Sequence, residues 1–179
     1  MNLSQHPYFN LATYRGNTVL DHHLWIDASR YLENDSEGLP TGQILPVRGT
    51  PMDFSSPKCV GEDIDTDFSA ICTVRGFDHC YCFDGADGTL AHRATLLHKP
   101  SGREMRLYTT QPALHLYTAN SFDKDLPLKG GYPQQAHFGL CLETQKMPDS
   151  VHHSHFTSTV LLPDEKYDHI TEYRFSVIS

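Results

Sequence analysis

Apolar and polar residues alternate along several short stretches of the chain, which is the pattern that half-buried β-strands produce. In the stretch 138–143, Leu140 and Leu142 share one face of such a strand, and Glu143 lies on the opposite face. A turn-like sequence follows at 147–150. The pattern therefore predicts a carboxylate at the end of an otherwise apolar strand, either as a solvated surface residue or in a partly desolvated pocket, where its pKa would rise.

The stretch 76–83 shows the same alternation and predicts another strand. Its aromatic residues share one face, and Asp78 shares the other face with Cys80 and Cys82. A carboxylate among small thiols needs hydrogen-bond donors. Asp78 is therefore expected either to accept a hydrogen bond from a ligand hydroxyl or to accept bonds from local backbone amides.

Two β-hairpins are also predicted. Residues 90–98 and 103–110 flank a turn that contains Pro and Gly, and residues 158–162 and 171–177 are expected to pair near the end of the chain.

A proline divides the strand run after the first hairpin, because proline cannot donate a hydrogen bond within a central ladder. Gln111 precedes this proline, and residues 113–118 resume the strand pattern. Gln111 thus ends a strand, and its amide, which can both donate and accept, faces either a ligand or water.

These elements predict an all-β protein with a sandwich-like arrangement of antiparallel strands. No helical apolar period persists for three turns, and neither an internal repeat nor a linker divides the chain. Residues 1–179 are accordingly expected to form a single domain or part of one.

The composition is that of an ordinary globular protein, and its charge narrows the possible partners. The formal net charge of −8 argues against nucleic acid and anionic membranes. No apolar run approaches a membrane span, and the N-terminal residues do not resemble a signal peptide, so the expected location is the cytoplasm. Five cysteines without a paired framework fit reduced thiols, and neither they nor the histidines at 152–155 show the ligand spacing of a metal site.

His6 lies in a segment, residues 2–11, that mixes hydrogen-bonding side chains with aromatic rings. Such a mixture suits a sugar, which presents apolar C–H faces and hydroxyls. Taken alone, however, a histidine beside a proline is more often an ordinary loop residue.

Several stretches together resemble the aldose 1-epimerase (galactose mutarotase) family, and they keep the family's order along almost the whole chain. These stretches are 2–11, 46–54, 76–79, 108–112, and 139–145 with 148–150. The family's chain is about twice as long, and this sequence resembles its C-terminal half.

The resemblance implies the antiparallel β-sandwich of the galactose mutarotase type, here its C-terminal portion. It also implies mutarotation, the interconversion of the α and β anomers of an aldohexose such as galactose or glucose, without a cofactor or a metal. By motif position, Glu143 is the base and His6 the acid, and Asp78 and Gln111 hydrogen-bond sugar hydroxyls. A glutamate and a histidine, with reference pKa values of about 4.3 and 6.5, need modest shifts to exchange protons near neutral pH.

The chain also departs from the family's pattern. His115 stands where the family usually has Gln, and Ala119 where it usually has Gly. The family's N-terminal half contributes an arginine and a second histidine that have no counterpart here. The alternative to an active mutarotase is therefore a truncated, catalytically weak remnant that binds carbohydrate or dimerises, and either self-association or an N-terminal half is expected to complete the sandwich.

Overall fold

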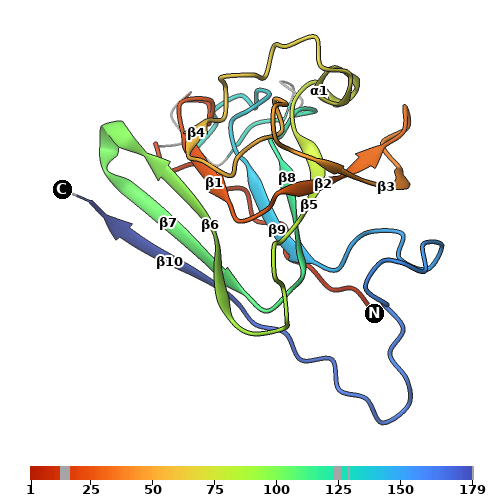
Figure 1. The fold of residues 1–179 in the computed structure, drawn as a ribbon. Coiled ribbons are helices and arrows are strands. Elements are labelled where there is room, and N and C mark those ends of the chain that lie inside the picture. Colours follow the sequence, from red (N-terminus) through yellow and green to blue (C-terminus); the bar gives the residue numbers. More distant parts are fainter. Residues whose placement is uncertain (13–16, 123–125, 129, 179) are drawn as a thin grey trace.

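The computed structural model describes residues 1–12, 17–122, 126–128 and 130–178. Within these residues, ten strands form two five-stranded antiparallel sheets (Figure 1). The first sheet contains β1 (His23–Ile26), β4 (Lys58–Cys59), β6 (Ala91–His98), β7 (Arg103–Thr109) and β10 (Thr171–Val177), in the order β10-β7-β6-β1-β4. The second sheet contains β2 (Arg30–Asn34), β3 (Pro40–Pro46), β5 (Asp78–Cys82), β8 (Ala113–Tyr117) and β9 (Cys141–Gln145), in the order β3-β2-β5-β8-β9. This architecture confirms the predicted all-β, antiparallel fold.

Two short helices interrupt the strands: α1 (Ser69–Val74) and the 3-10 helix η1 (Lys99–Ser101). Arg75 caps the C-terminus of α1 and adopts the left-handed conformation, with φ 57°. Its backbone N–H bonds back to the last turn of the helix. No helix in the described ranges has the length and apolar character that crossing a membrane requires.

The main hydrophobic core lies between the two sheets. Leu24 and Ile26 of β1 belong to one buried cluster with Leu114 and Leu116 of β8 and Leu142 of β9. Because successive strand residues face opposite sides, the neighbours of these leucines on β8 and β9 point away from the core. The outer face of the second sheet is therefore the face on which polar side chains can meet.

The prediction of two hairpins is half right. β6 and β7 form the predicted hairpin around η1. The predicted terminal hairpin is wrong, because residues 158–162 form no strand and β10 pairs with β7 instead. The alternation in β10 identified a strand without identifying its partner. The free edge of β7 offers β10 a longer ladder than residues 158–162 would. β10 thereby becomes the edge of the first sheet.

His79 is a buried polar residue on the core side of β5, with an exposed fraction of 1%. Burial, followed by the charge of His115, lowers its pKa from the ordinary 6.5 to about 4. The unfolded chain therefore takes up a proton on His79 before the folded chain does, so acid favours unfolding.

We expect the free energy of unfolding to fall as the pH drops from 6.5 towards 4, with a His79 contribution whose slope approaches about 1.4 kcal/mol per pH unit. Urea unfolding of the wild type and of His79→Gln across this range measures the contribution. The exposed His152→Gln serves as the control. A wild-type slope that His79→Gln reproduces would contradict the assignment.

Candidate active site

The N-terminal segment lies along the free edge of β9 and is fixed at both ends. Asn2 Nδ2 donates to the Lys146 carbonyl at 2.9 Å. Further along, the backbone N–H groups of Phe9 and Leu140 donate to each other's carbonyls at 2.8 and 2.9 Å. His6 lies between these two attachments and is thereby held beside β9.

Three neighbouring strands of the second sheet supply the other side chains of the site. In their register, His115 of β8 lies opposite Glu143 of β9. Tyr117 of β8 lies between Cys141 of β9 and Asp78 of β5. All five residues belong to the outward-facing set, so the alternation along each strand collects them on one face of the sheet.

Four of these side chains, all but Cys141, line a pocket of about 500 Å³. Its lining residues are His6, Tyr8, Asp78, His115, Tyr117, Glu143, Gln145 and Pro148. The ring centroids of His6 and Tyr8 are 5.0 Å apart, and those of Tyr8 and Tyr117 are 6.2 Å apart. The pocket thus combines aromatic faces with carboxylate, imidazole and amide groups, a combination suited to a small ligand that has both C–H faces and hydroxyls.

Two histidine–carboxylate pairs occupy this pocket. His6 Nε2 lies 3.2 Å from Glu143 Oε1, and His115 Nε2 lies 2.7 Å from Asp78 Oδ1. The Glu143 side chain is 13% exposed and the His6 side chain 53% exposed. A ligand that enters the pocket therefore meets the His6 ring first, and the Glu143 carboxylate lies deeper.

The surroundings of Glu143 raise its pKa. Burial raises the pKa of Glu143, the neighbouring His6 and His115 lower it, and the Asp78 carboxylate raises it further. The net increase brings the pKa of Glu143 closer to neutral than that of a solvated glutamate, which improves a carboxylate as a general base. Burial also raises the pKa of Tyr8 to about 12, so its phenol keeps its proton.

Cys141 lies on the other side of the His6 ring, with its Sγ 3.3 Å from His6 Nδ1. If Nε2–H of the neutral His6 ring donates to Glu143, then Nδ1 accepts from the Cys141 thiol. Ligand atoms of these three residues lie within 4.8 Å of one another, as a metal site would require. However, burial and the Glu143 and Asp78 carboxylates raise the pKa of the Cys141 thiol. Because a metal binds the thiolate, we assign no metal to this group.

The structure brings together three of the four site residues predicted from the sequence. His6, Asp78 and Glu143 line the pocket, and Gln111 is not among the lining residues. Gln111 is instead buried, and its Nε2 donates to Tyr167 Oη at 2.9 Å. A direct bond from Gln111 to a ligand therefore remains a prediction from the sequence.

Sequence reasoning did not assign Tyr8, Tyr117 or Gln145 to the site. Tyr117 follows from the alternation within β8, because it shares a face with His115. What the sequence lacked was the strand order, which places β8 between β5 and β9.

Known proteins resemble the chain throughout its length. The family model described as aldose 1-epimerase matches residues 1–174. The human galactose mutarotase is 40% identical over 177 residues, which are 99% of this chain and 50% of that protein. The aldose 1-epimerase of Escherichia coli is 32% identical over 177 residues, or 98% of this chain and 50% of that protein. The chain thus spans about half the length of the curated relatives it matches.

Solved structures show the same relationship. A GalM/aldose epimerase homologue from C. elegans superposes with a TM-score of 0.84 at 26% identity, covering 100% of this chain and 52% of that one. Galactose 1-epimerase from Lactobacillus acidophilus gives a TM-score of 0.81 at 29% identity, covering 98% of this chain and 48% of that one. With the family model matched over nearly all of its residues, the chain belongs to the aldose 1-epimerase family.

Proposed function

We propose that this chain is a mutarotase, an isomerase that interconverts the α and β anomers of an aldohexose such as galactose or glucose. The observation that carries the proposal is the His6–Glu143 pair, with 3.2 Å between Nε2 and Oε1, in a pocket walled by Tyr8 and Tyr117. The names of the relatives, galactose mutarotase and aldose 1-epimerase, support the same reaction.

In this proposal, the two members of the pair exchange protons with the sugar. The Glu143 carboxylate accepts the proton of the C1 hydroxyl, and His6 donates a proton to the ring oxygen as the C1–O5 bond breaks. Rotation about C1–C2 presents the other face of the aldehyde, and ring closure reverses both proton transfers. The raised pKa of Glu143 supports the proposal, because it narrows the difference between the proton affinities of base and substrate.

The remaining pocket residues would hold the sugar. The Asp78–His115 pair offers both an acceptor and a donor to ring hydroxyls, and Gln145 offers an amide. The rings of Tyr8 and Tyr117 would lie against C–H faces. His115 in place of the family's usual Gln brings a titratable donor to this part of the pocket.

Polarimetry on freshly dissolved α-galactose tests the proposal. We expect the purified chain to accelerate the decay of optical rotation to its equilibrium value relative to buffer alone. A chain that is folded by circular dichroism and does not accelerate the decay would instead support the alternative of a catalytically weak carbohydrate-binding remnant.

The proposal includes a polypeptide partner, either a second copy or an N-terminal half. Its support is the outer edge of β10, where Phe175 and Val177 are 61% and 75% exposed. Unpaired strand edges with apolar side chains are sites where another strand can add. A cytoplasmic location belongs to the same proposal and rests on the sequence alone.

A further inference from the structure

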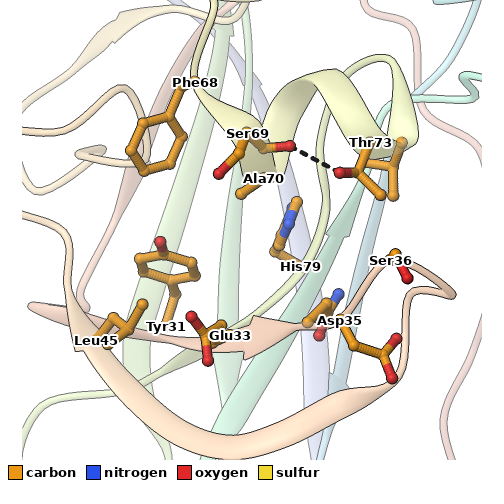
Figure 2. A pocket seen from close by; sticks show the side chains of 12 residues that line it. Tyr31, Glu33, Asp35, Ser36, Leu45, Phe68, Ser69, Ala70, Thr73 and His79 are labelled. Carbon is orange, nitrogen blue, oxygen red and sulfur yellow. Dashed lines mark hydrogen bonds between the residues drawn. The ribbon is translucent and has the colours of Figure 1, made fainter.

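A second pocket, of about 310 Å³, lies between α1 and the strands β2 and β5. Figure 2 shows His79 lying beneath Ala70 of α1 and Tyr31 beneath Phe68, the residue before α1. His79 immediately follows Asp78, and the two side chains lie on opposite faces of β5. The second pocket is therefore separated from the His6–Glu143 pocket by the thickness of one sheet.

His79 provides an unpartnered donor to this pocket. The residue is 1% exposed, and its Nδ1 accepts a hydrogen bond from the Asp78 backbone N–H at 3.1 Å. In the neutral ring the proton must then be on Nε2, for which the described residues offer no hydrogen-bond acceptor. This N–H is therefore free to donate to a ligand oxygen in the pocket that His79 lines.

Two further groups extend the polar side of the pocket. Tyr31 is a buried residue whose hydroxyl makes no hydrogen bond with the described residues, and Figure 2 shows this hydroxyl pointing towards Phe68. Glu33 Oε2 accepts from Thr41 Oγ1 at 2.7 Å, which orients the carboxylate and leaves Oε1 as a further acceptor. The pocket thus offers a donor, an acceptor and a hydroxyl that can do either.

The rest of the lining excludes some classes of ligand. Phe68 and Leu45 supply apolar surface opposite the polar groups. Neither Lys nor Arg is among the lining residues, whereas Glu33 and Asp35 are, so an anion would be repelled. A ligand with several hydroxyls and apolar C–H faces satisfies both sides of the pocket.

We propose that this pocket binds a small neutral polyol, whose hydroxyls accept from His79 Nε2–H and donate to Glu33. The site does not depend on the mutarotase proposal, because it uses other residues on the other face of the sheet. It is nevertheless linked to the first pocket through Asp78, whose backbone N–H bonds to His79 and whose carbonyl accepts from Asn34 Nδ2 at 3.1 Å. A ligand in the polyol site would therefore perturb the backbone at Asp78.

Long-range ¹H–¹⁵N NMR of the histidine rings tests the proposal, with myo-inositol as the probe. We expect inositol to shift the His79 Nε2 resonance, saturating in the millimolar range (Kd about 1 mM) as befits a small ligand. His6 and His115 report separately on the first pocket. Shifts confined to those two rings would overturn the proposal, as would a larger His79 response to ammonium ions than to inositol.

Two variants locate the binding. Ala70→Leu places a larger side chain in the pocket from α1 and should abolish the His79 response, whereas the exposed Ala86→Leu should retain it. Glu33→Gln keeps the side-chain volume and should weaken inositol binding by about tenfold. Retention of the wild-type response in both Ala70→Leu and Glu33→Gln would refute the site. Because the readout is a ring resonance, it stands whether or not the chain exchanges anomers.

Discussion

Glu143→Gln is expected to slow anomer exchange by about 10²–10⁴-fold, which is the usual contribution of a positioned general base. The amide has almost the same shape as the carboxylate and can still contact His6, but it cannot accept the proton of the C1 hydroxyl. Polarimetry on α-galactose gives the rate. Glu37→Gln removes an equal charge from an exposed turn and serves as the matched control, which should exchange anomers at the wild-type rate.

Glu143→Gln should not lose stability near neutral pH. The pKa of Glu143 is raised on folding, so its ionised form disfavours the folded state, and its stabilising contribution is present below the ordinary pKa of 4.5 and is lost as the pH rises. Gln carries no charge to bury, so we expect a free energy of unfolding at pH 7 at or above that of the wild type. A rate unaffected by Glu143→Gln would refute the base assignment, and a lower free energy of unfolding would point to a structural role.

Leu142→Ala changes the residue next to Glu143, and it should lower the free energy of unfolding while leaving the Glu143 carboxylate in place. Leu142 is 0% exposed in the core between the sheets, and truncating a buried leucine costs about 2–5 kcal/mol through lost burial and the cavity left behind. Urea unfolding measures the loss. The control is Leu162→Ala, which truncates a side chain that is 57% exposed and should change the free energy of unfolding by less than about 0.5 kcal/mol.

A loss below about 1 kcal/mol in Leu142→Ala would mean that β9 is not packed as described. Together, Leu142 and Glu143 test the alternation directly, because adjacent residues are expected to govern stability and activity separately.

Local alternation was enough to orient the side chains of β5 and β9. Asp78 and Glu143 were placed on faces opposite their apolar neighbours, and both line the pocket. That inference succeeds because a strand's period of two is a local property, visible in five or six residues. The separation of strands by turns that contain Gly and Pro similarly revealed the β6–β7 hairpin.

The alternation pattern could not identify contacts between residues that are distant in sequence. The acid role predicted for His6 came from the family resemblance, because nothing in its own segment indicates that it lies along β9. The wrong pairing of residues 171–177 has the same origin, since alternation does not say which edge a strand joins. Gln111 shows a third limit, because a residue at a strand end points either into a pocket or into the packed interior, and here it is buried against Tyr167.

The docking of the N-terminal segment on β9 also bears on how the site forms during synthesis. His6 and Cys141 are 135 positions apart, so the chain must be synthesised as far as β9 before the imidazole can meet its neighbours. At translation rates of 5–20 residues per second, about 7–27 s separate the synthesis of His6 from that of Glu143. The contact between His6 and Glu143 should therefore be among the last that a nascent chain forms, appearing after most of its strands have been synthesised.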